Sequence, residues 1–326
     1  MAIKSLGKYS SAGYKAVWGR TGYGAGNPPP PPPIIWYGDR GVVAGGHKGG
    51  QGDLNRIDYF AIASAGNASS FGSLSVARGY LTGVTNTSRA CFGGGYDSAT
   101  TIDYITVSST GNATDFGDLS TGAQSPTGTN DDTRGLFAGR ESPFSNVIQY
   151  ITIATTGNST DAGDLTRSVG VAAACSNGTR AVFAGGNLGG GPRSNVIDYV
   201  TIQTTNNCVD FGDLTQSVQG CEGNDNSDGR GVVGGGWVGS SSNVIEYFDI
   251  ATPGNATDFG DLTVSREYTA PAANGARGTW SGGSDGNGGT NHNEIDYITI
   301  ATTGNATDFG DLTDPSFLLA GTSGDS

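Results

Sequence analysis

The sequence predicts an all-β fold, a six-bladed kelch-like β-propeller whose ring is closed by the C-terminal strand, with an extended anchor peptide at the N-terminus. First, one phrase, clearest as IDYITIATTGNATDFGDLT at residues 295–313, recurs six times. Second, its tyrosines are separated by 45, 46, 49, 48 and 50 residues, a period typical of repeat architectures. Third, short runs of Ile, Val, Thr, Tyr and Phe alternate with turns rich in the chain's 57 glycines. This composition favours short strands over helices, and a four-stranded unit of this length is a propeller blade.

Residues 167–215 illustrate the four strands expected in each unit. The first strand is RSVGVAAAC and the second is RAVFAGG, which ends at a glycine doublet. The third is NVIDYVTIQ and the fourth is the short DFGDL. The third strand is apolar at consecutive positions, as expected for a strand buried between two neighbouring blades.

The two ends of the repeat region predict how the ring closes. The first unit begins at Arg40 with its second strand, so it lacks a first strand. The segment SFLLAG at 316–321 is a first strand with no unit after it. We expect this segment to pair with residues 40–46 and so to leave no exposed sheet edge.

Residues 1–27 lie outside the repeats and form a predicted anchor peptide. They contain no acidic residue, whereas the whole chain has a net charge of −13. They show no signal-peptide pattern. Residues 28–35 form a predicted linker whose six prolines would make a polyproline II rod of roughly 19 Å, and residues 36–326 form the propeller. The alternative is a disordered tail. The basic and aromatic residues expected to contact a larger assembly are Lys4, Lys8, Tyr9, Tyr14, Lys15, Trp18 and Arg20.

The sequence shows no catalytic, cofactor or metal motif, which predicts a protein that is not an enzyme. The two histidines have no partners at metal-ligand spacing, and the four cysteines form no CxxC pair. Sparse cysteines of this kind suggest buried free thiols, or at most an incidental bridge. The acidic charge balance argues against nucleic acid as a partner of the propeller. No apolar run approaches the length needed for membrane insertion.

Two sets of charged residues recur once per unit and need an explanation. Arginines precede the phrase at Arg40, Arg89, Arg134, Arg180, Arg230 and Arg277. Acids occur in the GDL step (Asp118, Asp164, Asp213, Asp261, Asp311) and in the third strand (Asp58, Asp103, Asp198, Glu246, Asp296). The arginines could pair with either set of acids. A ring that binds calcium or an anion is one interpretation, but we favour a structural network, because a binding site used once is not usually written six times.

The loops predict which face of the ring binds partners. The turns between strands one and two and between strands three and four share one face, and they are nearly identical in every copy. The loops between strands two and three share the opposite face with the connections between blades, and they differ in every copy. This divergent face is our predicted recognition face, and drift in unconstrained loops is the alternative. Its candidate residues are His47, Lys48, Tyr96, Arg140, Phe144, Arg193, Trp237 and His292.

The repeat resembles the kelch repeat of kelch-type propellers. The matching features are the glycine doublets, the tyrosine of the third strand and a later aromatic residue, which is Phe in five units and Ala162 in the third. The third unit also replaces its doublet by Gly139–Arg140. The doublets are Gly45–Gly46, Gly94–Gly95, Gly185–Gly186, Gly235–Gly236 and Gly282–Gly283.

The wording TGNATDFGDLT, together with the short N-terminal head, resembles kelch-like structural proteins of tailed bacteriophages, especially cyanophages. This resemblance implies a non-enzymatic virion protein on the exterior surface of the particle, in the capsid decoration, neck or tail fibre. It would be present in multiple copies, contact other virion proteins through residues 1–27, and contact a host-surface glycan or protein through the propeller for host attachment. The alternative is a secreted or cell-surface carbohydrate-binding propeller. A propeller enzyme of the galactose oxidase type is disfavoured, because the His and Tyr metal ligands are missing.

Overall fold

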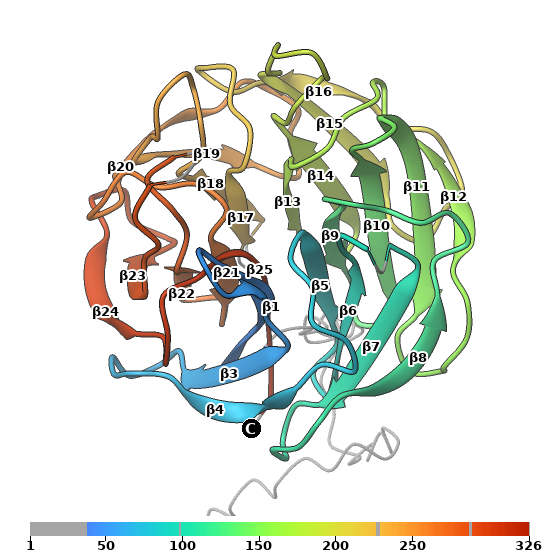
Figure 1. Cartoon of the computed structure of the whole chain (residues 1–326). Helices are drawn as coiled ribbons and strands as arrows, with labels where there is room; N and C mark the ends of the chain where they lie inside the picture. Colours follow the sequence, from blue (N-terminus) through green and yellow to red (C-terminus); the bar gives the residue numbers. More distant parts are fainter. Residues whose placement is uncertain (1–37, 98, 226–228, 287–288, 326) are drawn as a thin grey trace, which may run out of the picture. The chain divides into compact units, whose positions relative to one another are not determined.

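The computed structural model describes residues 38–97, 99–225, 229–286 and 289–325. Six antiparallel sheets are arranged as blades around a central axis (Figure 1). The predicted six-bladed propeller is therefore confirmed. The predicted anchor and linker, residues 1–35, lie outside the described residues.

Each blade is a short antiparallel sheet, and the blades are numbered here in chain order. Blade 1 contains β1 (Arg40–Lys48), β2 (Gly52–Asp53), β3 (Arg56–Ala61), β4 (Ser69–Ser73) and β25 (Phe317–Gly324). Blade 2 contains β5 (Leu81–Thr85), β6 (Arg89–Gly94), β7 (Thr101–Thr106) and β8 (Thr114–Asp118). Blade 3 contains β9 (Thr127–Asn130), β10 (Arg134–Arg140), β11 (Ser145–Thr152) and β12 (Thr160–Asp164).

The second half of the ring repeats the same order. Blade 4 contains β13 (Ala173–Ser176), β14 (Arg180–Ala184), β15 (Val196–Thr201) and β16 (Val209–Asp213). Blade 5 contains β17 (Glu222–Asp225), β18 (Arg230–Gly234), β19 (Val244–Asp249) and β20 (Thr257–Asp261). Blade 6 contains β21 (Ala270–Ala273), β22 (Arg277–Ser281), β23 (Glu294–Thr299) and β24 (Thr307–Asp311).

The C-terminal strand closes the ring as predicted. β25 pairs with β1 in antiparallel register, from Arg40 opposite Gly324 to His47 opposite Phe317. It thereby takes the inner position that β5 occupies in blade 2. The strand continues three residues beyond the predicted end at Gly321, because Thr322–Gly324 complete the pairing with β1. Blade 1 therefore joins the two ends of the repeat region.

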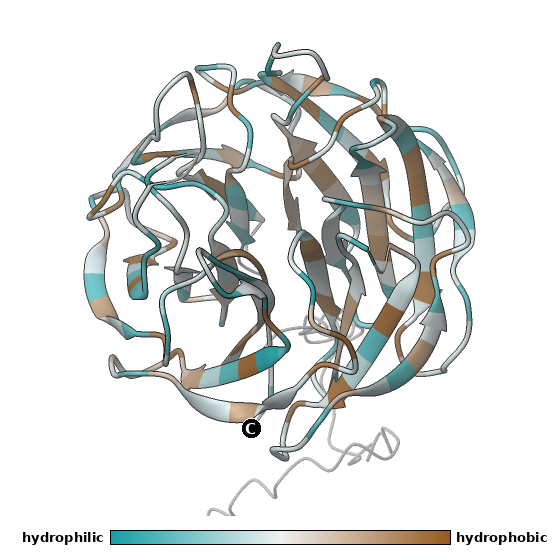
Figure 2. Cartoon of the chain, in the orientation of Figure 1, coloured by the Kyte–Doolittle hydropathy of each residue, from teal (hydrophilic) through white to brown (hydrophobic). Residues whose placement is uncertain are grey.

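The hydrophobic core lies between blades rather than at one centre. Each of six clusters combines the facing surfaces of two neighbouring blades. Between blades 4 and 5, for example, Val182 and Ile197 pack with Phe211, Val233 and Phe248. In Figure 2 the hydrophobic segments lie along the strands, whereas the connecting loops are mostly white or teal. Burial on both faces explains why the third strands are apolar at consecutive positions.

The glycine doublets end the second strands and join each blade to the next. In blade 5, Gly235 and Gly236 have φ angles of +70° and +102°, a region that favours glycine. A Cβ on Gly235 would lie 2.6 Å from the carbonyl oxygen of Arg266. The Gly236 N–H donates to the same carbonyl at 2.9 Å. The third unit, which lacks a doublet, keeps the equivalent bond from Arg140 N–H to Val169 at 2.9 Å.

A ring of backbone hydrogen bonds surrounds the axis at the start of the inner strands. One residue per blade donates its N–H to the carbonyl of the equivalent residue in the preceding blade, at 2.8–3.1 Å. All six residues have left-handed backbones with φ between +50° and +63°, although five are not glycine. Such a conformation is costly for a residue with a side chain and persists where surrounding bonds impose it. We call this set the axial ring, and it consists of Tyr80, Ser125, Val171, Gly220, Tyr268 and Leu318.

Candidate functional site

The six repeated arginines bind the neighbouring blade and its tyrosine. Arg89, for example, places its guanidinium 4.2 Å from the centroid of the Tyr104 ring and donates to the Ile153 carbonyl of the next blade at 3.0 Å. All six arginines repeat both contacts. The suggested pairing of these arginines with the repeated acids is therefore wrong. Register explains the contact, since the arginine lies diagonally across from the tyrosine on the adjacent strand.

The repeated acids of the third strands also have structural partners. Each accepts hydrogen bonds from a Ser or Thr in the connection that leaves the preceding blade, as Asp296 does from Thr263 at 2.6 Å. In blade 3 the acid is replaced by Gln149, which accepts from Ser120 at 2.8 Å. A second set of arginines neutralises four of the acids, in the pairs Arg56–Asp58, Arg78–Asp103, Arg167–Asp198 and Arg266–Asp296. Two of these pairs, Arg78–Asp103 and Arg266–Asp296, are completely buried.

The asparagines of the GNATD turns tie the outer strands together. Asn305 Oδ1 accepts the backbone N–H of Asp261 in the preceding blade at 3.2 Å. The equivalent bond recurs at every blade interface. Arginines, acids and asparagines thus form one repeated network, which we call the belt. This arrangement supports the structural interpretation of the repeated polar residues rather than a ring of ligand sites.

Side chains that differ between units meet at the mouth of the central channel, on the divergent face. A cavity of about 300 Å³ opens there. All six blades, or the connections that lead into them, contribute side chains to it. We call this site the channel mouth, and it is lined by Tyr80, Glu141, Asn187, Gln219, Trp237, Glu267, Tyr268, Ser284 and Phe317.

The scaffold explains how these nine residues come together. Tyr80 and Tyr268 belong to the axial ring, while Gln219, Glu267 and Phe317 each precede a ring residue. The other four are the residues that follow the doublet position of their blades. At all four of these positions, an isolated bridge pairs the residue after the doublet with a residue that precedes a ring residue, for example Trp237 with Gln219 and Ser284 with Glu267. The repeat therefore fixes the backbone positions of these residues, whereas the residue types at most of these positions vary between units.

Aromatic rings cover one side of the mouth. The Tyr80 and Tyr268 rings lie 6.3 Å apart, although blade 1 lies between the blades that they precede. The Phe317 ring lies 6.5 Å from Tyr268 and 5.5 Å from His47. Gln219 Nε2 lies 3.5 Å from the Tyr268 hydroxyl. These are edge or tilted contacts, which leave ring surface available to a ligand.

Two carboxyl groups of the mouth differ in their surroundings. Glu141 accepts hydrogen bonds from two neutral donors, Asn187 Nδ2 at 2.7 Å and Ser125 Oγ at 2.9 Å. Glu267 is only 4 % exposed. Among the described residues, no group donates a hydrogen bond to its carboxyl or forms an ion pair with it. Burial raises the pKa of Glu267 to about 7. Burial, and then the nearby carboxylates, also raise the pKa of Tyr80 and Tyr268.

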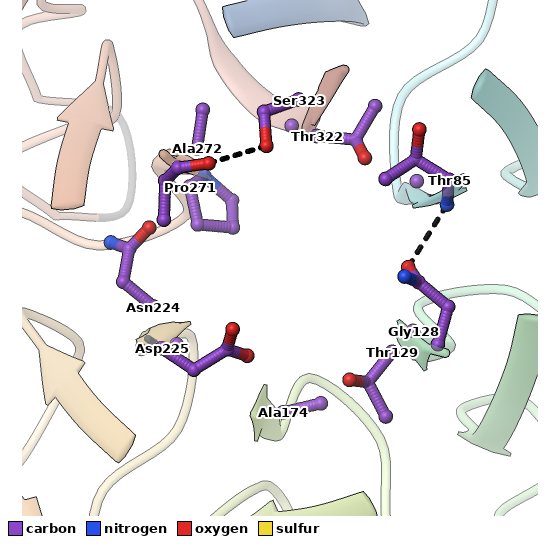
Figure 3. A pocket seen from close by; sticks show the side chains of 15 residues that line it. Thr85, Gly128, Thr129, Ala174, Asn224, Asp225, Pro271, Ala272, Thr322 and Ser323 are labelled. Atoms are coloured by element: carbon purple, nitrogen blue, oxygen red, sulfur yellow. Dashed lines mark hydrogen bonds between the residues drawn. The ribbon is translucent and has the colours of Figure 1, made fainter. Parts of the chain in front are cut away.

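The opposite end of the channel is narrower and more regular. Inner strands of all six blades line a cavity of about 70 Å³ there (Figure 3). Thr85 N–H donates to Asn130 Oδ1 at 2.9 Å, and Ser176 N–H donates to Asp225 Oδ2 at 2.7 Å. Burial raises the pKa of Asp225 to about 7, although the bond from Ser176 opposes the shift. The six inner strands contain Glu222 and Asp225 and no basic residue.

The predicted recognition residues are spread over the divergent face. Among these eight, Trp237 alone lines the cavity. His47 and Tyr96 flank it, with His47 bonded to Asp53 at 2.8 Å and Tyr96 49 % exposed beside Tyr80. The other five lie in local contacts or partly buried loops: Lys48 with Asp314, Arg140 with the Gly122 carbonyl, His292 beside Glu294, and the half-buried Phe144 and Arg193.

Eight of the nine lining residues were missed from the sequence. Glu141, Asn187 and Ser284 had a detectable signal, because the position after the doublet differs in every unit. Of the remaining five, Phe317 begins β25, and the other four, among them Tyr80 and Glu267, lie in connections just before an inner strand, where the sequence shows no common motif. Their position follows from the axial ring, which only the fold reveals.

Cysteine chemistry agrees with the prediction of buried free thiols, since Cys91, Cys175, Cys208 and Cys221 are all free and buried. Burial raises the pKa of Cys91 to about 12. Within the described part of the chain, no group of three or more His, Cys, Asp or Glu side chains could hold a metal ion. The described residues also contain no helix long and apolar enough to cross a bilayer.

No protein-family model matches the chain, and no curated protein is significantly similar to it in sequence.

Proposed function

We propose that this chain is a non-enzymatic binding protein of a bacteriophage virion, displayed on the exterior surface as a kelch-like propeller. Residues 1–27 anchor it to other virion proteins, and the channel mouth contacts a partner or host surface. The observation that supports binding is the channel mouth, where nine side chains, most of them different from those at the equivalent positions of other units, meet on a scaffold that repeats six times. Concave sites with aromatic walls and a few polar groups are typical of ligand recognition.

The assignment to a virion is supported by the wording of the repeat and by the basic head before the proline linker. Quantitative mass spectrometry of purified particles from the source tests it. We expect the chain at a fixed ratio to the major capsid protein, with a high ratio for capsid decoration and a low one for neck or tail. Absence of the chain from the particles would contradict the virion role.

The role of the anchor is tested by deletion of residues 1–27. We expect the shortened chain to fold and to be lost from particles. Incorporation at the normal ratio would contradict the anchor role and leave the propeller itself as the attachment site.

A secreted or cell-surface carbohydrate-binding propeller is the second candidate. Aromatic rings beside carboxyl and amide groups at the mouth favour it, because sugar rings stack on aromatic faces and bond to such groups. A glycan array probed with the wild type and with Trp237→Ala separates the two candidates. Binding of neutral glycans that requires Trp237, together with absence from particles, would favour the second.

A further inference from the structure

We propose that the channel mouth binds one small organic cation, a guanidinium or ammonium group, between the carboxyl groups of Glu141 and Glu267 and the rings of Tyr80, Tyr268 and Trp237. The inference deepens the proposed binding function and rests on it. Its chemistry applies equally to a free amine or guanidine and to an Arg or Lys side chain of a partner protein.

The carboxyl group of Glu267 is the first observation that points to a cation. Glu267 is 4 % exposed and lines the cavity, yet among the described residues it has no donor. Its oxygens reach the cavity, but a carboxylate with so little exposed surface and no protein donor is only partly compensated for the hydration it loses. A cation in the cavity would supply the missing partner. Arg266, the adjacent residue in the chain, does not do so, because its guanidinium pairs with Asp296 at 2.9 Å.

The charge of the lining favours a cation over an anion. Among the residues that the structure describes, two carboxyl groups and no Lys, Arg or His side chain line the mouth. Described basic side chains beside the lining are already bonded: His47, whose ring contacts Phe317, is bonded to Asp53 at 2.8 Å, and Arg140 donates to the Gly122 carbonyl at 2.9 Å. An anionic ligand would therefore meet only like charge, whereas a cation is attracted from outside.

The aromatic side chains of the lining also suit an organic cation. Tyr80, Tyr268 and Trp237 present aromatic surface next to the carboxyl groups. Aromatic faces attract guanidinium and ammonium groups, and the attraction grows when water is excluded. A cavity of about 300 Å³ has room for a group of this kind together with several carbons of its stem. A bare metal ion fits less well, since the described residues offer no cluster of metal ligands.

The test is a calorimetric titration of the full-length chain with butylguanidinium and with butylurea, its neutral isostere, at pH 8. At this pH Glu267 is mostly ionised, and the other ionisable groups facing it are Glu141, Tyr80 and Tyr268, with Asp53 and His47 at the rim. We expect butylguanidinium to bind at least 10-fold more tightly than butylurea. Equal affinities, or no binding of butylguanidinium, would overturn the proposal.

Variants locate the site. Glu267→Gln keeps the size of the side chain and should weaken butylguanidinium binding at least 10-fold, and Glu141→Gln provides a second, independent loss. Asp115→Asn is the matched control, because it removes one exposed acid from β8 without touching the mouth. It should change the affinity less than 2-fold. Wild-type affinity in Glu267→Gln and Glu141→Gln, or equal losses in all three variants, would overturn the site.

A third ligand, N-acetyl-arginine amide, distinguishes the two sources of the cation. Tighter binding of this capped arginine than of butylguanidinium would indicate a partner side chain, and weaker binding would indicate a free small molecule. Binding of neutral monosaccharides that equals or exceeds that of butylguanidinium would overturn the proposal in favour of a sugar site. None of these results depends on whether the chain is found in particles, so a failure here is distinct from failure of the virion assignment.

Discussion

The belt and the channel mouth use the same kinds of residue for opposite purposes. In the belt, Arg, Asp, Asn and Tyr form identical contacts at each blade interface, as Arg89 does with Tyr104. At the mouth, the position after the doublet has a different side chain in every blade, and the Glu267 carboxyl has no partner among the described residues. Repetition of a polar residue therefore indicates a structural role in this fold, whereas a polar or aromatic side chain that occurs once at a repeated position indicates recognition.

The largest expected effect comes from breaking a buried ion pair of the belt. Asp296→Ala leaves the Arg266 guanidinium buried without its partner, since both side chains are completely buried. We expect the free energy of unfolding to fall by about 3–5 kcal/mol. Urea unfolding followed by tyrosine and tryptophan fluorescence measures the loss. Asp308→Ala is the control, because Asp308 lies opposite Asp296 on the next strand but is exposed, and a loss of similar size there would contradict the account.

A smaller effect is expected at the glycine of the GDL step. Gly260 has a φ of +150°, and a Cβ there would lie 2.4 Å from the carbonyl oxygen of Gly304 in the next blade. Gly260→Ala should therefore destabilise the protein by about 2 kcal/mol. Gly254→Ala is matched to it, since a Cβ at Gly254 meets nothing within 4 Å. Equal melting temperatures for the two variants would show that the outer strands do not pack as closely as described.

At the channel mouth we expect a pH-dependent effect on stability rather than a packing effect. The pKa of Glu267 is about 7 in the folded protein, above its ordinary value of 4.5, so the folded state keeps a proton that the unfolded state releases. Stability contributed by this group is present below pH 4.5 and is lost as the pH rises to about 7. The free energy of unfolding of Glu267→Gln, taken relative to that of the wild type, should therefore rise by about 1–3 kcal/mol between pH 4.5 and pH 8.

Thermal unfolding of both proteins across this pH range measures the difference. Asp225 titrates in the same range, but it is present in both proteins and cancels. A difference between the two proteins that stays constant with pH would contradict the assignment of Glu267 as a buried carboxyl without a partner.

The smallest effect is expected from a single stacking contact of the belt. Arg89→Met keeps the aliphatic stem and removes the contact with Tyr104 and the bond to Ile153. We expect the free energy of unfolding to fall by about 1 kcal/mol. Arg193→Met, in a loop of the divergent face, should cost less, and chemical denaturation compares the two. A larger loss at Arg193 would reverse the roles assigned to the belt and the divergent face.

The fold was predictable from the sequence because its determinants recur. The tyrosine and arginine positions gave the number of blades, and the SFLLAG segment gave the ring closure that β25 confirms. The contact between arginine and tyrosine was not predictable, since it depends on the register of two strands. The channel mouth was even harder to predict from the sequence, because Tyr80, Glu141 and Glu267 have no shared spacing and meet only through the axial ring.

Two tryptophans allow the central claim to be tested within one molecule. Trp237 lines the mouth, whereas Trp280 is completely buried between blades and donates from Nε1 to the Glu222 carbonyl at 3.0 Å. The measurement is ¹⁹F NMR of the full chain labelled with 5-fluorotryptophan, with resonances assigned by single Trp→Phe variants and titrated with butylguanidinium at pH 8. The account predicts a saturable shift of the Trp237 resonance and none at Trp280. No shift of the Trp237 resonance, or equal shifts of both resonances, would contradict the division between a structural belt and a channel mouth that binds a ligand.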